Sequence, residues 1–460
     1  MSCVILVADG ARPDTLRAAM DAGHLPALDA LRRAGGAHDV TSVFPSVTGP
    51  AWVPFLTGRH PGTVGIPGIR WWDRTGARAY AHGTARSYVG FEALRQDGDL
   101  DPAVPTLFEL AERPLAALTP LGRGLPDGAR LGTAIHHWPR LAWTHFRGDI
   151  AGWLRLERAL AAQVADRVDA GRPDLVVFGH QCIDKLSHLR GHGAPEVLEA
   201  LRLVDAMAAR LADDAARRGD PLHLIVVSDH GHSPVTGHLD LAGWLRAMGL
   251  GVRAHPFPFL GGDDVAVMVG GNAMAHLHLE LTRPARPWWP RLARRWDPVV
   301  TALLDTDAVE LALLPIAPGH CEIRARGGRA EVVRDRHGYT YRALDGDPLG
   351  LASALGASGA VEGLDADAAH AACAATPFPD ALVQVLALAD GPRAGDVILS
   401  AALGWDLRAR WEPIPHRSTH GSLRAAHLQV PLLTSWPLAR PPRRTTEVFD
   451  LARAAMAAGR

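Results

Sequence analysis

The chain has 460 residues, of which 47% are hydrophobic and 21% are charged. This composition is typical of a soluble globular protein with a large core, and the length allows one large domain or two to three smaller ones. Because the formal net charge is only −1, no overall field attracts nucleic acid or an anionic membrane. We therefore expect neither as a partner, and an anionic ligand has to be met by a local site. The oligomeric state stays open.

The four cysteines lie far apart and form no CxxC pair: Cys3, Cys182, Cys321 and Cys373. This spacing argues against a disulfide framework and against a cysteine-rich zinc module. No apolar run approaches the ~18–20 residues that span a bilayer. The first residues, SCVILVADG, read as a core strand rather than a signal peptide, which predicts a cytoplasmic location.

Short apolar runs alternate along the chain with Ala/Leu/Arg-rich stretches of helical period. The expected strands cover residues 3–8, 129–137, 174–179, 222–228, 396–401 and 429–434. The expected helices cover residues 25–34, 105–113, 151–170, 195–218 and 239–248. Continuous apolar strands between amphipathic helices predict an α/β fold, with a mostly parallel central sheet flanked by helices on both faces.

The sequence pattern changes between about residues 250 and 395. Strand-like runs follow one another closely there, and an Ala-rich stretch ends the region. We interpret residues 251–395 as a strand-rich cap inserted into a catalytic core formed by 1–250 and 396–460. The basic, aromatic segment 284–299 could indicate a nucleic-acid patch, but the neutral net charge favours an exposed helix or loop.

Acidic and histidine side chains collect where the predicted strands end. Asp9 follows the first strand, Asp184 and His188 follow the strand at 174–179, and Asp229-His230 follows the strand at 222–228. The carboxyl ends of strands form the functional crevice of open α/β sheets. Clustered Asp and His side chains favour Zn²⁺, with Mn²⁺ as the alternative.

Each of these pieces also has a structural interpretation. Asp9 could cap a helix, and the i, i+4 spacing of Asp184 and His188 suits a surface ion pair as well as two metal ligands. Adjacent Asp229 and His230 at the end of a buried strand are costly without a partner, which favours a functional role.

Thr48 adds a hydroxyl group to these candidates. It lies in TSVFPSVTGPAWVPFLTGRHPGTVGI (41–66), before Gly-Pro and the apolar positions of an expected helix. Backbone N–H groups at a helix N-terminus favour an anion. A simple N-cap is the alternative.

Taken together, these motifs resemble the alkaline phosphatase superfamily, and within it the type I phosphodiesterase/nucleotide pyrophosphatase family. The similar segments, including VVSDHG and THGS, cover roughly residues 1–250 and 395–437. The matching residues, in chain order, are Asp9, Thr48, Asp184, His188, Asp229, His230 and His420.

The resemblance implies two divalent metal ions, with Zn²⁺ first and Mn²⁺ second. One ion would be held by Asp184, His188 and His420, with His416 as a rival for the third position. The other would be held by Asp9, Asp229 and His230, with the Thr48 hydroxyl beside it. Thr48 would then act as the nucleophile and form a phospho-threonine intermediate.

The sequence departs from the family pattern at Ala51, where nucleotide pyrophosphatases carry an Asn that donates to a phosphoryl oxygen. The Gly49 backbone N–H can still face the oxyanion. Lys185, the only lysine among 48 basic residues, is the candidate replacement, although a solvated lysine explains it as well.

Three further residues are candidates for substrate binding: Trp71, Trp72 and Asn272. The resemblance places aromatic residues near the leaving group, but core packing would explain both tryptophans, and a turn after Gly-Gly would explain the asparagine. Several histidines crowd the ligand segments and could orient the metal ligands. They are His180, His192, His232 and His238.

We therefore expect a metal-dependent phosphoester hydrolase that acts on a small-molecule substrate. Monoester and diester preference are not separated by the sequence. A phosphonate hydrolase is the first alternative. A non-catalytic, metal-binding relative of the fold is the second, supported only by Ala51.

Overall fold

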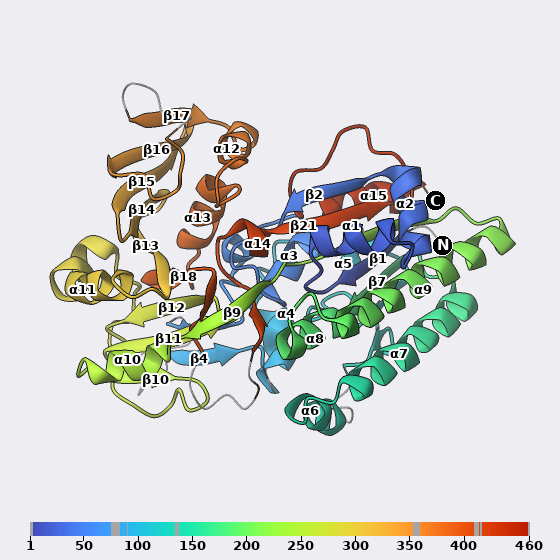
Figure 1. Ribbon diagram of the computed structural model, residues 1–460, viewed down its shortest axis with the longest axis horizontal. Coiled ribbons are helices and arrows are strands. Elements are labelled where there is room, and N and C mark those ends of the chain that lie inside the picture. The colour runs from blue at the N-terminus through green and yellow to red at the C-terminus, as the bar shows by residue number, and fades with distance from the viewer. Residues whose placement is uncertain are drawn as a thin grey trace.

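The computed structural model describes residues 3–74, 83–89, 91–133, 138–352, 359–408, 414 and 416–458. Two large sheets lie side by side, one of seven strands and one of nine. Figure 1 shows the seven-stranded sheet with its helices on the right and the nine-stranded sheet on the left. No helix in the described part of the chain is long and apolar enough to cross a membrane.

The seven-stranded sheet is mostly parallel, as the sequence predicts. Its strands, in spatial order, are β2 (Ala37–Thr41), β21 (Gln429–Thr434), β8 (His223–Val227), β1 (Cys3–Ala8), β7 (Leu175–His180), β5 (Pro114–Ala117) and β6 (Arg130–Leu131). The five strands from β8 to β6 run parallel, and only the pairings of β21 with β8 and with β2 are antiparallel.

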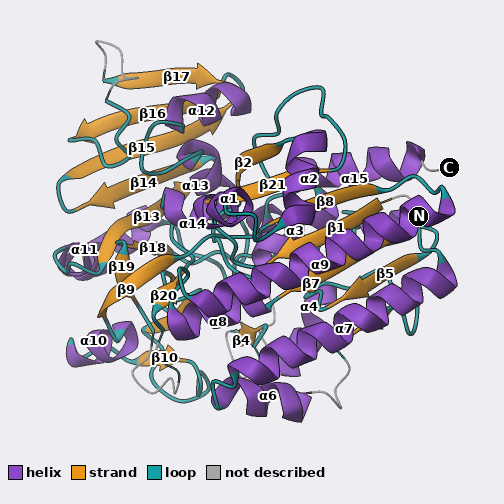
Figure 2. Ribbon diagram, turned by 45° about the vertical axis from the view of Figure 1, so that its right-hand side comes forward, coloured by secondary structure: helices purple, strands orange, loops and turns teal. Residues whose placement is uncertain are grey.

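Helices cover both faces of this sheet. Alternate side chains of a strand point to opposite faces, and every residue of β1 is buried. Val4 and Leu6 pack against one set of helices, while Ile5 and Val7 pack against the other. Figure 2 shows α7 to α9 lying across the first face. The first set is α1 (Pro13–Asp21), α2 (Pro26–Gly35), α7 (Ile150–Gly171), α8 (Cys182–Arg190) and α9 (Pro195–Arg218), and the second is α3 (Val53–Thr57), α5 (Leu107–Leu110) and α15 (Glu447–Ala458).

The nine-stranded sheet is antiparallel apart from its first pair. Its order is β10 (Val252–Ala254), β11 (Val265–Gly270), β12 (Met274–Leu279), β18 (Val397–Ala401), β13 (Val309–Ala317), β14 (His320–Ala325), β15 (Gly328–Asp335), β16 (Gly338–Asp345) and β17 (Ala360–Leu364). α10 (Leu241–Ala247) and α11 (Trp289–Leu304) pack on one face, and α12 (Ala366–Cys373) and α13 (Ala381–Ala389) on the other.

Smaller elements connect the two sheets. β9 (Ser233–His238) pairs with β19 (Gly404–Asp406) and β20 (Ser418–Thr419), and β3 (Arg70–Asp73) pairs with β4 (Thr84–Ser87). The remaining helices are α4 (Gln96–Asp99), α6 (Trp138–Phe146) and α14 (Ala425–Leu428), with 3₁₀ turns η1 (Pro50–Trp52), η2 (Pro61–Val64) and η3 (Phe91–Arg95).

The structure corrects the assignment of the strand expected at 396–401. β18 does not return to the seven-stranded sheet; it lies between β12 and β13 in the nine-stranded sheet. A short, mostly apolar run carries no information about which sheet it joins, because either sheet would bury both of its faces. The division into a core of 1–250 and 396–460 and a cap of 251–395 remains a prediction.

Two other expected elements differ near the edge of the parallel sheet. The helix expected at 105–113 covers only α5, which a capping box between Thr106 and Glu109 begins. The chain then enters β5, a strand without β-branched residues that the sequence pattern missed. Of the strand expected at 129–137, β6 is the described part, and residues 134–137 lie outside the described residues.

A buried amide ties the loop before Thr48 to α13. The Phe44 N–H donates to Gln384 Oε1 at 2.8 Å, and Gln384 Nε2 donates to Ser42 O at 3.1 Å and to Asp380 Oδ2 at 2.8 Å. Asp380 in turn accepts two hydrogen bonds from Arg444, each of 2.8 Å. The loop position therefore depends on one glutamine that is fully buried.

We predict that Gln384→Leu lowers the free energy of unfolding by about 2–5 kcal/mol, because a backbone donor and a backbone acceptor are left buried and unpaired. Thermal or denaturant unfolding measures the change. Gln163→Leu, on the exposed side of α7, is the matched control and should shift stability by less than about 0.5 kcal/mol. Equal stability of the two variants would contradict the role of Gln384.

Candidate metal centre

The candidate site lies at the carboxyl ends of three adjacent parallel strands. Asp9 directly follows β1, Asp229 follows β8, and Asp184 lies in the first turn of α8, just after β7. Because the spatial order is β8, β1, β7, the three carboxylates converge at one edge of the sheet. All three are 1% exposed or less.

A first group contains Asp184, His188 and His420. The Nε2 of His188 lies 3.2 Å from Asp184 Oδ1, and the Nε2 of His420 lies 3.6 Å from the same oxygen. Asp184 and His188 are four residues apart in α8, so both lie on one face of this helix. The Asp184 carboxylate is buried, and His420 is a further side chain at the same oxygen. Both observations favour a pair of metal ligands over a surface ion pair.

Backbone carbonyl groups orient the rings of both histidines. His188 Nδ1 lies 2.8 Å from Ser418 O, and His420 Nδ1 lies 2.8 Å from Ser46 O. Because a carbonyl oxygen only accepts, each Nδ1 donates its proton, and Nε2 is the ring atom that faces Asp184. Two imidazole Nε2 atoms directed at one carboxylate oxygen suit a bound cation, toward which each Nε2 would turn its lone pair.

His416, the rival of His420, lies beside this group. Its ring centroid is 4.3 Å from that of His188, and its Nδ1 contacts the side-chain amide of Asn272. The structure therefore brings His420 rather than His416 to the Asp184 carboxylate.

A second group contains Asp9, Asp229 and His230. His230 Nε2 lies 3.3 Å from Asp9 Oδ1 and 3.7 Å from Asp229 Oδ2. The Thr48 hydroxyl lies 3.1 Å from Asp9 Oδ1 and 3.1 Å from His230 Nε2. Asp9 Oδ2 and Asp229 Oδ2 are buried and have no hydrogen-bond partner among the described residues. These carboxylate and imidazole donors fit a divalent metal ion.

The electrostatics of the second group also favour a cation. Burial and the nearby Asp9 carboxylate raise the pKa of Asp229 to about 7. Burial alone would lower the pKa of His230, but Asp229 and Asp9 outweigh this effect and raise the pKa to about 9. At neutral pH the group thus binds protons that a metal ion would displace.

Lys185 pairs with the other oxygen of the Asp184 carboxylate. Its Nζ lies 2.8 Å from Asp184 Oδ2, and its side chain is 28% exposed. Burial raises the pKa of Asp184, but Lys185 and His188 outweigh burial and hold this pKa well below its usual range. The carboxylate therefore stays ionised, as a metal ligand requires.

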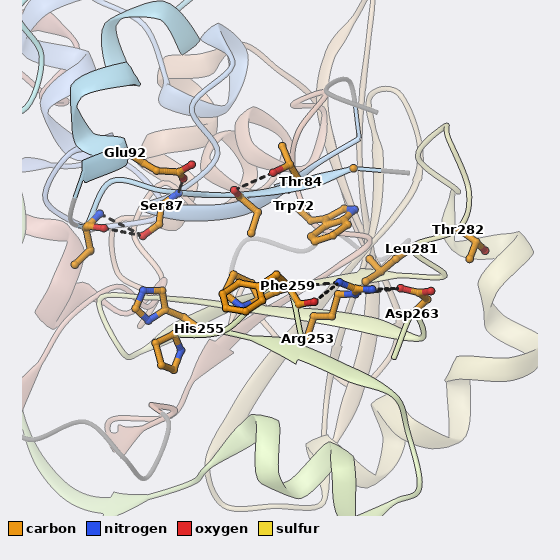
Figure 3. A pocket seen from close by; sticks show the side chains of 15 residues that line it. Trp72, Thr84, Ser87, Glu92, Arg253, His255, Phe259, Asp263, Leu281 and Thr282 are labelled. Carbon is orange, nitrogen blue, oxygen red and sulfur yellow. Dashed lines mark hydrogen bonds and ion pairs between the residues drawn. The ribbon is translucent and has the colours of Figure 1, made fainter. Parts of the chain in front are cut away.

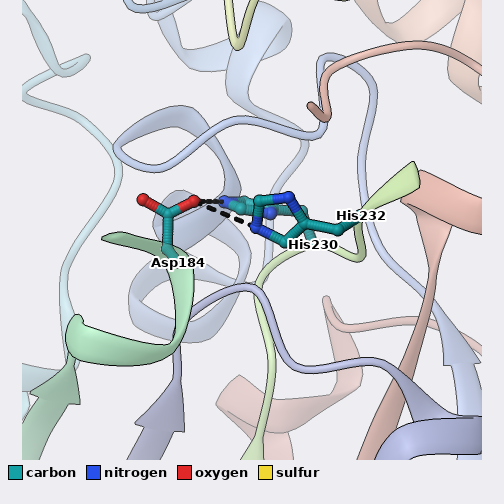
Figure 4. Close-up of side chains that lie close together, drawn as sticks. All are labelled: Asp184, His230 and His232. Atoms are coloured by element: carbon teal, nitrogen blue, oxygen red, sulfur yellow. Dashed lines mark hydrogen bonds and ion pairs between the residues drawn. The ribbon is translucent and has the colours of Figure 1, made fainter. Parts of the chain in front are cut away.

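Of the four histidines expected to orient ligands, His232 is the one whose side chain is described in contact with the side chain of a candidate ligand. Its Nε2 lies 3.1 Å from Asp184 Oδ1, and Figure 4 shows it beside His230 at that oxygen. Asp184, His230 and His232 form a third group of metal-ligating side chains. Burial lowers the pKa of His232 to about 3. His180 and His238 pair with other carboxylates, Glu157 and Asp406.

The segment that follows Thr48 is less helical than the sequence suggests. Thr48 precedes the short turn η1 and the five-residue α3, with Gly49 between them at a φ of 100°. Glycine adopts this conformation without strain. A Cβ at this position would lie 3.6 Å from Gln96 Nε2, so space is available and the backbone conformation is what requires glycine.

The two tryptophans expected near the substrate have different environments. Trp72 lines a cavity of about 600 Å³ together with Ser87 and Arg253 (Figure 3). Trp71 is fully buried in the core, and its ring packs edge-on against Tyr88 with the centroids 5.0 Å apart. Core packing therefore accounts for Trp71, and Trp72 remains the candidate for substrate contact.

Asn272 supports the strand that carries His420. Its backbone forms an isolated β-bridge with His420, and its φ of 66° is one that asparagine tolerates better than most residues. Its side chain contacts His416. The structure thus gives Asn272 a role in the turn, the alternative that the sequence left open.

Solved structures of known proteins share this fold over nearly the whole chain. Phosphonoacetate hydrolase from Sinorhizobium meliloti 1021, in complex with phosphonoacetate, is 17% identical with a TM-score of 0.58, covering 99% of this chain and 96% of that one. Human ectonucleotide pyrophosphatase/phosphodiesterase 5 is 13% identical with a TM-score of 0.59, covering 99% and 95%. An inactive variant of the murine protein, in complex with AMP, is also 13% identical, with a TM-score of 0.57 and the same coverage.

No curated protein sequence matches the chain. The family model for type I phosphodiesterase / nucleotide pyrophosphatase matches residues 3–423, a span that includes every candidate metal ligand. The predicted resemblance and fold class are confirmed, and the chain belongs to the type I phosphodiesterase/nucleotide pyrophosphatase family of hydrolases that act on phosphoric ester bonds.

Proposed function

We propose that the chain is a two-metal phosphoester hydrolase in which Thr48 is the nucleophile. The observation that carries this proposal is the position of the Thr48 hydroxyl, 3.1 Å from Asp9 Oδ1 and 3.1 Å from His230 Nε2. Thr48 is also half-buried rather than enclosed, which leaves its hydroxyl accessible to a substrate.

Two divalent ions, with Zn²⁺ preferred over Mn²⁺, would occupy the first and second groups. Carboxylate and imidazole donors without thiolates are compatible with both metals, and nitrogen-rich sets favour zinc. When bound, the ions would lower the pKa of the Thr48 hydroxyl and stabilise the attacking and leaving oxygens of an in-line displacement.

In the proposed reaction the Thr48 oxygen attacks phosphorus and forms a P–O bond as the bond to the leaving group breaks. The leaving group departs with the bonding electron pair and takes up a proton. Water then attacks phosphorus in the phospho-threonine, which releases phosphate or a phosphomonoester and restores the hydroxyl. The Gly49 N–H and the Lys185 ammonium are the groups we assign to the non-bridging phosphoryl oxygens.

The substrate is a small molecule whose organic part we place at the cavity lined by Trp72. The family favours a phosphodiester or pyrophosphate. A phosphonate is the second candidate, because the similar phosphonoacetate hydrolase aligns over 99% of this chain and the diesterase-type Asn is replaced by Ala51.

We predict that Thr48→Ala lowers the turnover of zinc-loaded protein by roughly 10³-fold or more, because no other hydroxyl takes the place of the nucleophile. Hydrolysis of bis-para-nitrophenyl phosphate, para-nitrophenyl phosphate and phosphonoacetate, measured in parallel, identifies the substrate class. Thr48→Ser is the matched control and should retain activity within about tenfold. Metal binding by the wild-type chain without turnover of any of the three would favour the non-catalytic alternative.

We predict that zinc affinity rises with pH between 6 and 8. Zinc binding requires deprotonated Asp229, with a pKa of about 7, and neutral His230, with a pKa of about 9. Protons therefore compete with the metal more strongly as the pH falls, and the affinity should change by at least about tenfold per pH unit. Competition with a chromophoric chelator measures the affinity, and calorimetry in two buffers counts the released protons. An affinity independent of pH would argue against zinc at the second group.

We predict that Lys185→Met lowers kcat/KM more than tenfold while both metal ions stay bound. The substitution removes the ammonium from Asp184 and from the transferred phosphoryl group. Steady-state kinetics and metal analysis of the same preparation separate the two effects. Arg190→Met removes a half-exposed cation from the same helix and is the control; kinetics of Lys185→Met that match it would exclude the role of Lys185.

A further inference from the structure

We propose that His232 is a positioning residue that orients two ligands of the first metal ion, Asp184 directly and His188 through Ser418. This inference rests on the proposed occupancy of the first group by a metal ion. It assigns a role to a side chain that does not take part in the proposed chemistry itself. The imidazole is fully buried, so it has no access to a substrate.

Both oxygens of the Asp184 carboxylate are held by a side chain. Lys185 Nζ lies 2.8 Å from Oδ2 and His232 Nε2 lies 3.1 Å from Oδ1. Together these contacts define the plane of the carboxylate. Oδ1 keeps a lone pair on the side of His188 Nε2 and His420 Nε2. The first metal ion would bind among these three atoms.

The other ring nitrogen of His232 reaches the residue that orients His188. His232 Nδ1 lies 3.1 Å from Ser418 Oγ, and Ser418 O accepts the Nδ1 proton of His188 at 2.8 Å. Ser418 thus contacts His232 with its side chain and His188 with its backbone. Displacement of His232 would disturb both ligands at once.

The ring has to donate from Nε2 for this arrangement to hold. Ser418 Oγ also lies 2.8 Å from Ser187 O. The single hydroxyl proton of Ser418 is therefore shared between two acceptors, Ser187 O and His232 Nδ1. A charge-assisted bond from Nε2–H to a carboxylate is roughly twice as strong as a neutral one. With Nε2 unprotonated, its lone pair would face the buried Asp184 carboxylate and repel it. This repulsion costs more free energy than the sharing of one serine proton between two acceptors.

The first loop after β1 is shaped to admit this ring. Gly10 has a φ of 78°, and a Cβ there would come within 2.7 Å of His232 Nε2 and 3.3 Å of Asp184 Cα. Any other residue at this position would push the imidazole off the carboxylate. Arg12 adds a hydrogen bond to the backbone oxygen of His232.

A direct metal ligand is the competing role for His232. The first group joins Asp184 to His188 and His420, whereas His232 groups with Asp184 and His230. His230, the other histidine of that group, also contacts Asp9 and Asp229 in the second group. The grouping favours orientation of the carboxylate over coordination of the first ion.

The test compares zinc and cobalt binding by the wild-type chain, His232→Leu, His232→Gln and Ser418→Ala. We expect His232→Leu to weaken one of two bound ions by about 10–100-fold, the range typical of such supporting contacts. His232→Gln, whose amide can donate to Asp184, should restore affinity to within about threefold. Ser418→Ala should weaken the same ion by a smaller factor. Competition with a chelator gives the affinities, and the visible spectrum of bound cobalt reports the ligand set.

His276→Leu is the matched control, since it removes another fully buried imidazole, in the nine-stranded sheet, and should leave both ions bound with wild-type affinity. Wild-type affinity in both His232→Leu and Ser418→Ala would overturn the proposal. So would a His232→Gln variant that loses the ion entirely with a changed cobalt spectrum, because His232 would then be a ligand. These readouts do not require turnover, so an inactive wild-type chain that binds two ions would contradict the proposed function and leave this inference standing.

Discussion

Three carboxylates at one buried edge of a parallel sheet are the constraint on which the rest of this protein depends. Asp9, Asp184 and Asp229 are almost completely removed from water. Like charges about 4 Å apart repel by about 4 kcal/mol at an effective dielectric constant of 20, and desolvation adds to this cost. The raised pKa of Asp229 is the direct consequence. Cations bound among these groups would convert the same cluster from a source of instability into a stabilising one.

Both sheets contribute to this centre, although the carboxylates all belong to the parallel one. His420 and Ser418 lie in the segment between β19 and β21, next to the turn that joins β11 and β12. Gly271 and Asn272 in that turn pair with the backbone of His420. The nine-stranded sheet therefore supports His420, the third candidate ligand of the first group.

The most specific feature of the centre is how firmly Asp184 is held. Lys185 contacts one carboxylate oxygen, and His188, His232 and His420 approach the other. A carboxylate with so many partners has one orientation, and orientation is what supporting residues contribute to a metal site. The carboxylates of the second group are held less firmly, since Asp9 and Asp229 each have one buried oxygen without a hydrogen-bond partner among the described residues. The hydroxyl of Thr48, the proposed nucleophile, contacts Asp9 and His230 in this group.

The sequence by itself predicted the strand and helix alternation, the mostly parallel sheet and, through the family resemblance, the side chains proposed as metal ligands. These features follow from local information: periodicity gives the elements, and polar residues at strand ends give the site. Only the tertiary structure decided that β18 joins the second sheet, that His420 rather than His416 reaches Asp184, and that Trp72 rather than Trp71 lines a cavity. It also brought His232 to the Asp184 carboxylate. Each of these outcomes depends on contacts between residues distant along the chain, and burial patterns within a short window carry no record of such contacts.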